Sequence, residues 1–301
     1  MFKIYFALTI SVISISMAGN LVRLCGAHPF IIAFYRLIFA LIILFPFFLP
    51  KFLKSYKKIP LKIYLKIALM GVVFVAHFYG WFYSIYMTKV ANATITFATN
   101  PAFIALGAYL FLKEKLDRYI WFSIIMGIVG VIILGFEDFT LSPKYFLGDL
   151  LALFAGIIFS IYFLIGKSLR DNSKVNIDNI VLMYLVYFFA ATVASAVVLF
   201  SNLKILDIDQ RAFWSLIALT IFPTILGHVL LIYVLKEMKA SIVSAATFVE
   251  PVVAGVAAYF LFTESLTVRA LMGYLFIVIG LSILVFTRDR VYNRNLNKIA
   301  N

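Results

Sequence analysis

Charged residues are scarce in this sequence of 301 residues. Asp, Glu, Lys and Arg together make up 13% of it, whereas an average soluble domain contains about 25%. Hydrophobic residues reach 64%, and the mean hydropathy is +1.07. A soluble core cannot hide that much apolar surface, so the composition excludes an ordinary soluble protein and predicts a chain that lies in a lipid bilayer.

Cysteine and the common catalytic motifs are also nearly or wholly missing. Cys25 is the single cysteine, which excludes an intrachain disulfide and a multi-cysteine metal site. The sequence contains no Gly-x-x-x-x-Gly-Lys-Ser/Thr, no His-Glu-x-x-His and no Gly-x-Ser-x-Gly motif, which mark ATP-binding proteins, zinc peptidases and serine hydrolases. We therefore expect no enzyme activity, no cofactor and no bound metal.

Long apolar runs make up most of the sequence. The net charge of +13 does not indicate a nucleic-acid partner, because Lys and Arg are scattered between these runs instead of forming a basic stripe. Each run is long enough to cross the ~30 Å hydrocarbon layer as a helix. The ten runs cover residues 4–22, 30–49, 63–88, 90–112, 119–136, 146–166, 180–200, 213–235, 240–262 and 268–287.

The distribution of basic residues orients these spans. An even number of spans places both termini on one side of the membrane. If that side is the cytoplasm, cytoplasmic segments hold 19 Lys and Arg and external segments hold 6, with Arg36 inside a span. Because Lys and Arg favour the cytoplasmic side, we expect a multi-pass protein of the inner (cytoplasmic) membrane with both termini in the cytoplasm.

The chain repeats itself after 150 residues. This shift aligns identical residues without gaps: Tyr83 with Tyr233, Lys89 with Lys239, Pro101 with Pro251, Tyr109 with Tyr259, Gly130 with Gly280 and Phe136 with Phe286. Each copy has five spans, an odd number, so the second copy enters the membrane from the opposite side. Inverted repeats of this kind are typical of secondary transporters.

The predicted fold class is therefore an all-α integral membrane protein, with ten transmembrane helices arranged as two inverted five-helix repeats. The first repeat is expected in residues 1–138 and the second in residues 139–288. Residues 289–301 are expected to form a basic cytoplasmic tail.

Several motifs resemble the repeat of the EamA-type drug/metabolite transporters. They are Pro101-Ala102-Phe103 followed by Leu112-Lys113-Glu114-Lys115-Leu116 and Gly130, and, in the second copy, Glu250-Pro251, then Leu261-Phe262-Thr263-Glu264-Ser265-Leu266 and Gly280. Pro29 with Arg36, and Gly148-Asp149-Leu150, are similar to the family pattern as well. The resemblance covers nearly the whole chain. It implies a ten-helix carrier of small metabolites such as amino acids, nucleobase-like compounds or drugs, and it does not identify the substrate.

Two ionisable residues lie deep inside spans, where a charge costs several kcal/mol unless it is paired or hydrated. Arg36, in the second span, is either an anchor for a substrate carboxylate or phosphate or a structural lock onto helix-end carbonyls or an acid. Glu250, in the ninth span, is either a proton-coupling carboxyl or ligand for a substrate amine, or a protonated or Arg-paired structural acid.

Neighbouring polar and aromatic residues have alternative interpretations too. Pro101 and Pro251 are expected to kink the fourth and ninth spans. Asn100, related to Glu250 by the repeat, either lines the same polar site or closes the Pro101 kink with a hydrogen bond. Tyr79 belongs either to an aromatic wall for the substrate or to the packing of the third span.

His77 and His228 lie at similar depths in the third and eighth spans. Neither has a second metal ligand at i+3 or i+4, the spacing that a helical metal site requires. Each is either a proton relay or a side chain bonded to a neighbouring helix.

Together these features favour a gradient-driven secondary transporter of small metabolites, amino-acid-like or related compounds, that works by alternating access in the export direction. Its expected partners are the small-molecule substrate and the lipid bilayer, and a homo-oligomer is compatible with the sequence. Two alternatives stay open: a lipid-flippase-like or partner-dependent membrane subunit, and, with less support, an integral-membrane enzyme.

The topology can be tested with reporter fusions. Fusions at Lys57 and Asn172 should report the cytoplasm and fusions at Ser142 and Asp207 the outside, because the basic segments are retained on the cytoplasmic side. Activity of a periplasm-dependent reporter such as alkaline phosphatase measures each site. Opposite results at either pair would overturn the ten-span arrangement.

Overall fold

The computed structural model describes residues 2–114, 118–135, 143–171 and 176–263, with single positions and short stretches between 268 and 283. In these residues all regular secondary structure is helical. Eight described segments are long and apolar enough to cross a membrane: Phe2–Cys25, Pro29–Lys58, Leu61–Met87, Asn92–Leu112, Pro143–Arg170, Asn179–Phe200, Gln210–Val234 and Ala240–Phe262. They confirm an all-α membrane fold and correspond to eight of the ten predicted spans.

The helices of the first half are α1 (Phe2–Ser16), α2 (Ala18–Cys25), α3 (Pro29–Ser55), η1 (Tyr56–Lys58), α4 (Leu61–Met87), α5 (Val90–Phe97), α6 (Asn100–Leu112) and α7 (Arg118–Gly135). Those of the second half are α8 (Pro143–Arg170), α9 (Asn179–Phe200), α10 (Gln210–Leu219), η3 (Thr220–Val229), α11 (Leu230–Val234), α12 (Ala240–Ala246), η4 (Thr247–Val249) and α13 (Glu250–Phe262). Helix α7 covers the fifth predicted span. Most of the tenth, at 268–287, lies outside the described residues.

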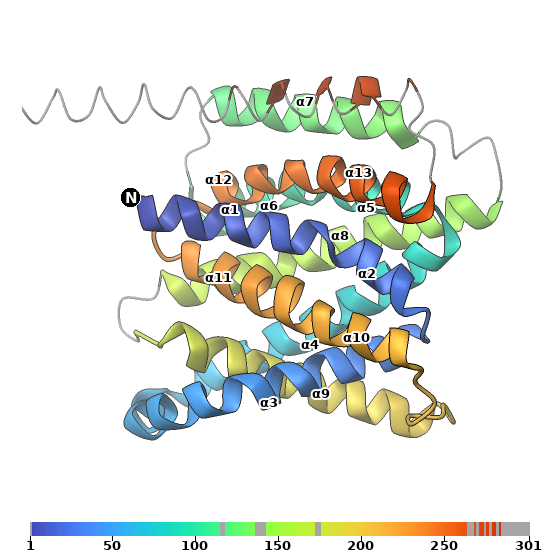
Figure 1. Ribbon diagram of the computed structural model, residues 1–301. Helices are drawn as coiled ribbons and strands as arrows, with labels where there is room; N and C mark the ends of the chain where they lie inside the picture. The colour runs from blue at the N-terminus through green and yellow to red at the C-terminus, as the bar shows by residue number, and fades with distance from the viewer. Residues whose placement is uncertain are drawn as a thin grey trace, which may run out of the picture.

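The two halves interlock with opposite direction (Figure 1). Helices α5 and α6 cross the molecule one way, and their counterparts α12 and α13 return beside them, so that α6 packs on α12 and α5 packs on α13. The third span of each half also packs on the first span of the other half: α4 lies against α8, and α10 and η3 lie against α2 and α1. Neither half can therefore bury its apolar faces without the other.

The shift of 150 residues is preserved in the backbone. Helices α5 and α12 begin after Lys89 and Lys239, which have nearly the same extended conformation, with ψ of 147° and 144°. Helices α6 and α13 end at Lys113 and Thr263, which both adopt the left-handed conformation, with φ of 56° and 55°. Left-handed residues commonly end helices because they let backbone N–H groups cap the last carbonyls. The repeated backbone confirms the duplication that the sequence predicts.

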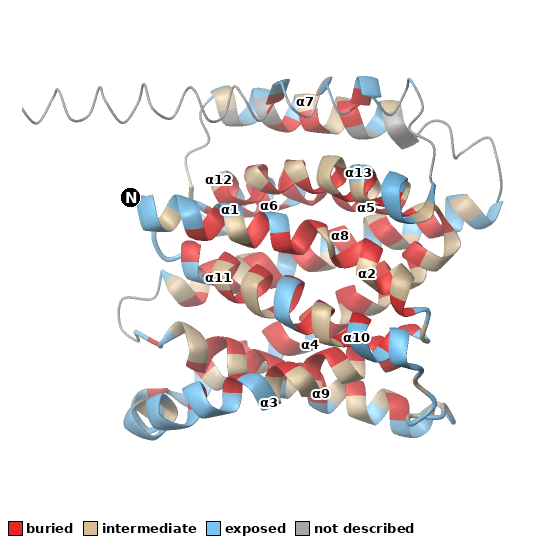
Figure 2. Cartoon of the chain, viewed as in Figure 1, coloured by how far each residue is buried: buried red, intermediate tan, exposed pale blue. Residues whose placement is uncertain are grey.

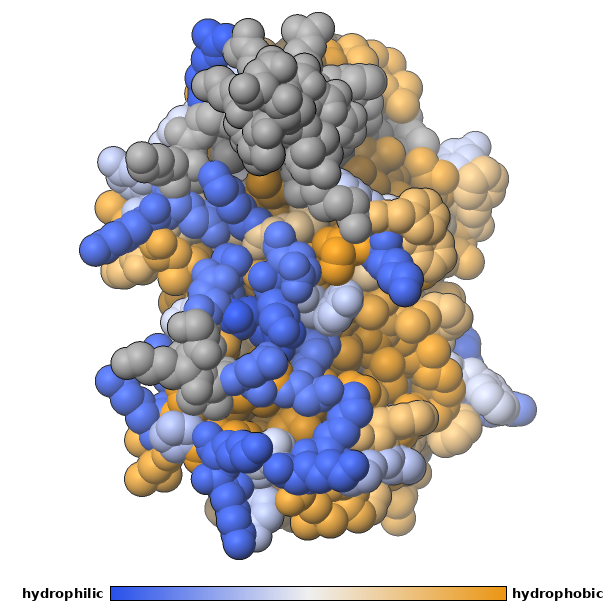
Figure 3. Space-filling model, turned by 90° about the vertical axis from the view of Figure 1, so that its left-hand side faces the viewer, coloured by the Kyte–Doolittle hydropathy of each residue, from blue (hydrophilic) through white to orange (hydrophobic). Residues whose placement is uncertain are grey.

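The two ends of the molecule differ in charge. We call the basic end the one that carries the chain around residues 51–62, 113–114, 167–171 and 235–239, together with the N-terminus (Figure 1). Seen from this end, hydrophilic side chains gather in the middle while hydrophobic ones cover the flanks (Figure 3). The opposite end carries residues 26–28, 88–89 and 201–209.

Buried residues lie in the interior of the bundle, and exposed residues lie on its outer faces and at its ends (Figure 2). Large apolar side chains on the outer faces are exposed, such as Phe45 and Phe47 on α3 and Phe154 on α8, as expected where a bundle meets lipid. Buried positions face the interior between the helices. Arg36, only 1% exposed, belongs to this interior.

Candidate functional site

A small cavity lies where helices of both halves meet. It encloses about 20 Å³, which is the space of one or two water molecules. Arg36, His77, His228 and Glu250 all line it, and they come from α3, α4, η3 and α13 respectively. The structure thus brings together four of the six predicted site residues, two from each half.

Arg36 presents part of its guanidinium without a partner. Its Nε donates a hydrogen bond to Oγ1 of Thr224, and its central carbon lies 4.2 Å from the centre of the Phe78 ring. Its terminal nitrogens Nη1 and Nη2 are buried and have no hydrogen-bond partner among the described residues. Buried charged groups are normally paired, so these nitrogens have donor capacity left for an acceptor.

Thr224 owes its position to an irregular helix. The segment Thr220–Val229 is a π-helix and contains Pro223, whose missing N–H would bond the Leu219 carbonyl in a regular α-helix. The hydroxyl of Thr224 donates to that carbonyl instead, at 2.9 Å. This bond turns the oxygen's acceptor side toward Arg36. Sequence reasoning missed Thr224, although Pro223 inside an apolar span was the available signal.

Glu250 lies at the start of α13, directly before Pro251. A turn of 3-10 helix, Thr247–Val249, separates α12 from α13, so the ninth span is interrupted beside the cavity. The side chain of Glu250 is buried and makes no hydrogen bond or ion pair with a described residue, Arg36 included. The positive pole of the α13 N-terminus favours a carboxylate at this position.

Aromatic rings form much of the remaining wall. Trp81, Phe97 and Phe159 line the cavity, with ring centres 5.8 Å apart for Trp81 and Phe97 and 5.4 Å apart for Phe97 and Phe159. The rings of His77 and His228 lie edge to face with centres 6.2 Å apart, and Nδ1 of each has no hydrogen-bond partner in the part of the chain that the structure describes. Rings in this arrangement offer faces for stacking and for a cation.

Asn100 and Tyr79 are not among the residues that line this cavity. Asn100 is the first residue of α6, ahead of Pro101, and its amide donates to the Phe97 carbonyl at 3.0 Å. This is the contact that the kink-closing interpretation describes. Tyr79 packs edge to face on Phe30, with ring centres 4.7 Å apart.

Comparison with known proteins identifies the family. The sequence model of the EamA-like transporter family matches residues 2–136 and again residues 146–286. The chain belongs to the EamA-like transporter family. The two matches fall on the two structural halves and confirm the resemblance of the sequence motifs.

Relatives of this EamA-like chain support the same assignment. An uncharacterized transporter of Clostridium kluyveri is 27% identical over 73% of this chain and 70% of its own length. An S-adenosylmethionine uptake transporter of Rickettsia felis is 23% identical over 89% of this chain and 86% of its own. A crystal structure with 14% identity covers 97% of this chain and 99% of its own, with a TM-score of 0.76, which supports the fold. The protein is therefore a multi-pass membrane transporter of small metabolites.

The role of Thr224 can be tested by substitution. Thr224→Val keeps the shape but removes the acceptor of the Arg36 Nε–H, so the third nitrogen of that buried guanidinium also loses its partner at a cost of about 1–3 kcal/mol. We expect a lower melting temperature in detergent, and Thr224→Ser should restore it. Thr192→Val, at an exposed threonine whose hydroxyl bonds its own helix, is the control. Equal melting temperatures for Thr224→Val and the control would contradict this geometry.

Proposed function

We propose that this EamA-like chain is a secondary transporter that carries small zwitterionic, amino-acid-like metabolites across the cytoplasmic membrane by alternating access. The observation that carries the proposal is the cavity between the halves. There the free nitrogens of Arg36 and the carboxyl of Glu250 face one space that aromatic rings surround.

The two ionisable groups define the charge of the substrate. A carboxylate bound to Arg36 would satisfy its two terminal nitrogens in the two-pronged geometry that a guanidinium prefers. An ammonium group near Glu250 would balance the carboxylate. A substrate without a carboxylate leaves the guanidinium buried and unpaired, which costs several kcal/mol in a membrane. A substrate without an ammonium group leaves the Glu250 carboxylate unpaired unless it takes up a proton. Zwitterions are therefore favoured over simple anions, cations and neutral solutes.

The aromatic wall suggests what else the substrate carries. S-adenosylmethionine, the compound in the name of the Rickettsia relatives, has an amino-acid carboxylate and ammonium, a sulfonium cation and a flat adenine ring. The first pair suits Arg36 and Glu250, and the other two suit the rings of Trp81, Phe97 and Phe159. We propose S-adenosylmethionine and related amino-acid conjugates as the first compounds to test.

Orientation and direction complete the proposal. We propose that the basic end faces the cytoplasm, because its lysines and arginines outnumber those of the opposite end. Net flux in such a carrier follows the gradients of substrate and coupling ion, so the same site supports the export that the sequence favours and the uptake named for the Rickettsia relatives. Glu250 can also bind a proton when no ammonium is present, which would link transport to a proton gradient.

The decisive experiment pairs variants of the protein with analogues of the ligand. S-adenosylmethionine should raise the melting temperature of the purified protein, because ligands stabilise the state that they bind. Decarboxylated S-adenosylmethionine should stabilise it much less. In Arg36→Ala the two compounds should become equal, since the guanidinium that distinguishes them is gone. Arg118→Ala, at an exposed arginine stacked on Tyr119, is the control and should behave as the wild type.

Further variants and a flux assay separate the alternatives. Arg36→Lys should recover only part of the discrimination, because an ammonium lacks the two-pronged geometry. Glu250→Gln should weaken binding of compounds with an ammonium group. The protein should still prefer S-adenosylmethionine over its decarboxylated analogue. The purified chain alone in liposomes should transport the compound that it binds, whereas a partner-dependent subunit would not. An Arg36→Ala protein that keeps the carboxylate preference would refute the proposed site.

A further inference from the structure

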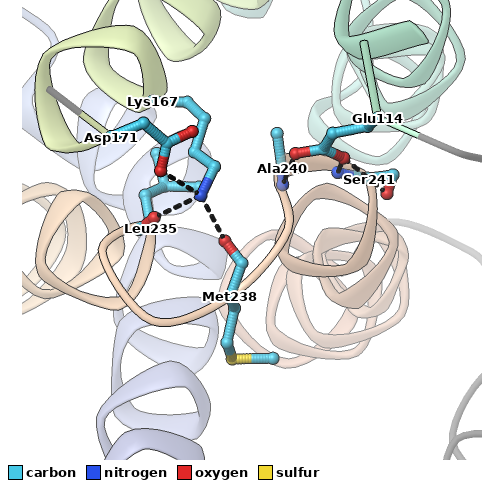
Figure 4. Close-up of polar contacts among 7 residues, drawn as sticks. All are labelled: Glu114, Lys167, Asp171, Leu235, Met238, Ala240 and Ser241. Atoms are coloured by element: carbon cyan, nitrogen blue, oxygen red, sulfur yellow. Dashed lines mark hydrogen bonds and ion pairs between the residues drawn. The ribbon is translucent and has the colours of Figure 1, made fainter. Parts of the chain in front are cut away.

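A buried lysine holds together two helices at the basic end. Lys167, near the end of α8, is 7% exposed. Its ammonium donates to the carbonyls of Leu235 and Met238, at 2.9 and 3.0 Å, and pairs with Asp171 at 2.7 Å. Figure 4 shows all three contacts converging on one nitrogen. The two carbonyls belong to the turn between α11 and α12, where the third span of the second half ends.

An arginine makes the corresponding contacts at the opposite end. Arg23, in the last turn of α2, donates from Nη2 to the carbonyls of Ile85 and Thr88, at 2.9 and 2.6 Å. Residues 85 and 88 become 235 and 238 when the repeat shift of 150 is added. Both cations therefore bind the same two carbonyls of the repeated unit, one cation at each end of the molecule.

The backbone around the two sites is the same. The N–H of Thr88 bonds the Ser84 carbonyl at 3.0 Å, and the N–H of Met238 bonds the Val234 carbonyl at 3.1 Å. Arg23 and Lys167 themselves are 144 positions apart, so the sequence shift of 150 does not align them. Only the structure identifies them as counterparts, each from the first span of its half.

Each cation satisfies groups that need a partner. The last carbonyls of a helix have no intrahelical donor, and a positive charge there also interacts favourably with the helix dipole. The turn that each cation holds leads directly into a span that lines the cavity: residues 85–89 lead into α5 with Phe97, and residues 235–239 lead into α12 and α13 with Glu250. Releasing the turn frees that span to move at its own end.

A carboxylate strengthens the contact at the basic end. Glu114 accepts hydrogen bonds from the backbone N–H groups of Ala240 and Ser241, at 2.8 and 3.3 Å, and from the Ser241 hydroxyl at 3.0 Å (Figure 4). It caps the N-terminus of α12 and ties the first half to the second. Its repeat counterpart, Glu264, lies outside the described residues.

We propose that Arg23 and Lys167 are the paired gating residues of this transporter. Each holds one mouth of the cavity closed by fixing the turn between the third and fourth spans of its half, and the transport cycle releases one contact while the other stays formed. Both contacts are formed in the described conformation, in agreement with a cavity too small for a metabolite. This inference rests on the proposed alternating access and names the residues that control it.

The test measures one distance across each mouth. Spin labels at positions 113 and 239 report on the basic end, and labels at 89 and 263 report on the opposite end. The shift of 150 relates the two pairs, so they are matched reporters. All labels are introduced as cysteines after replacing Cys25 by Ala, because Cys25 is the single native cysteine. Pulsed electron resonance in lipid nanodiscs then gives the populations of short and long distances.

Opposite responses are expected from the two gating residues. Lys167→Met should raise the long-distance population of the 113–239 pair and not that of the 89–263 pair. Arg23→Met should do the reverse. Each variant loses two charge-assisted hydrogen bonds, and Lys167→Met also loses the ion pair with Asp171, so we expect at least about a tenfold change in the ratio of closed to open populations. Lys167→Arg and Arg23→Lys, which keep the charge, should restore the wild-type ratios.

Controls separate gating from general destabilisation. Lys51→Met removes an exposed ion pair with Asp178 at the basic end and should move neither distance. If a methionine variant does not fold, the glutamine variants replace it. Lys167→Gln must then raise the long-distance population of the 113–239 pair, and Arg23→Gln must raise that of the 89–263 pair. The inference would be overturned if either variant broadened the distance distributions of both label pairs, or if neither distribution changed. Distances that respond as expected without any flux in liposomes would instead refute the proposed transport function and leave the gating contacts standing.

Discussion

Arg36 and Glu250 set the main constraint on this structure: two ionisable side chains face one cavity inside a bundle surrounded by lipid, and they are not paired with each other in the described residues. Burying such groups is costly, so the surrounding helices must stabilise them with hydrogen bonds, ring contacts and helix ends. Thr224 and the Phe78 ring stabilise one part of the guanidinium, and the start of α13 favours the carboxylate. The terminal nitrogens of Arg36 have no hydrogen-bond partner among the described residues.

The irregular helices follow from this constraint. Regular spans would present only side chains to the cavity and would keep every backbone group bonded. The π-helix at Thr220–Val229 and the breaks before Asn100 and Glu250 place a hydroxyl, a helix start and a carboxyl near the middle of the bundle. Interrupted helices at membrane depth are tolerated where they border protein or a cavity, and here they lie at the junction of the halves.

The duplication of the chain accounts for the similar cation contacts at the two ends of the molecule and for a cavity between the halves. Because the halves are inverted, the same turn occurs once at each end, and a cation from the first span reaches the same two carbonyls each time. The cavity, by contrast, is not symmetric: Asn100 closes a helix break where its counterpart Glu250 lines the cavity. Symmetric ends around an asymmetric site suit a carrier that binds one kind of substrate from two sides.

Much of the fold could be predicted from the sequence, because span length depends on local composition and the 150-residue repeat appears when the chain is aligned with itself. Six residues were predicted as site candidates one by one, and the packing of α3, α4, η3 and α13 brings four of them to one cavity. Asn100 and Tyr79, the other two, do not line it. Thr224 was missed because its role depends on a π-helix. Lys167 and Arg23 enter the sequence analysis only through the count of basic residues on each side, since nothing local shows which carbonyls they reach.

The most direct test of a single cavity reached from two ends is the accessibility of one cysteine that lines it. Ser16 lines the cavity, and Ser16→Cys in the Cys25→Ala background can be treated with a membrane-impermeant thiol reagent in right-side-out and in inverted vesicles. We expect labelling from both sides and protection by a bound amino-acid-like substrate in both kinds of vesicle. Labelling from one side only, with no protection by any compound that stabilises the protein, would contradict it.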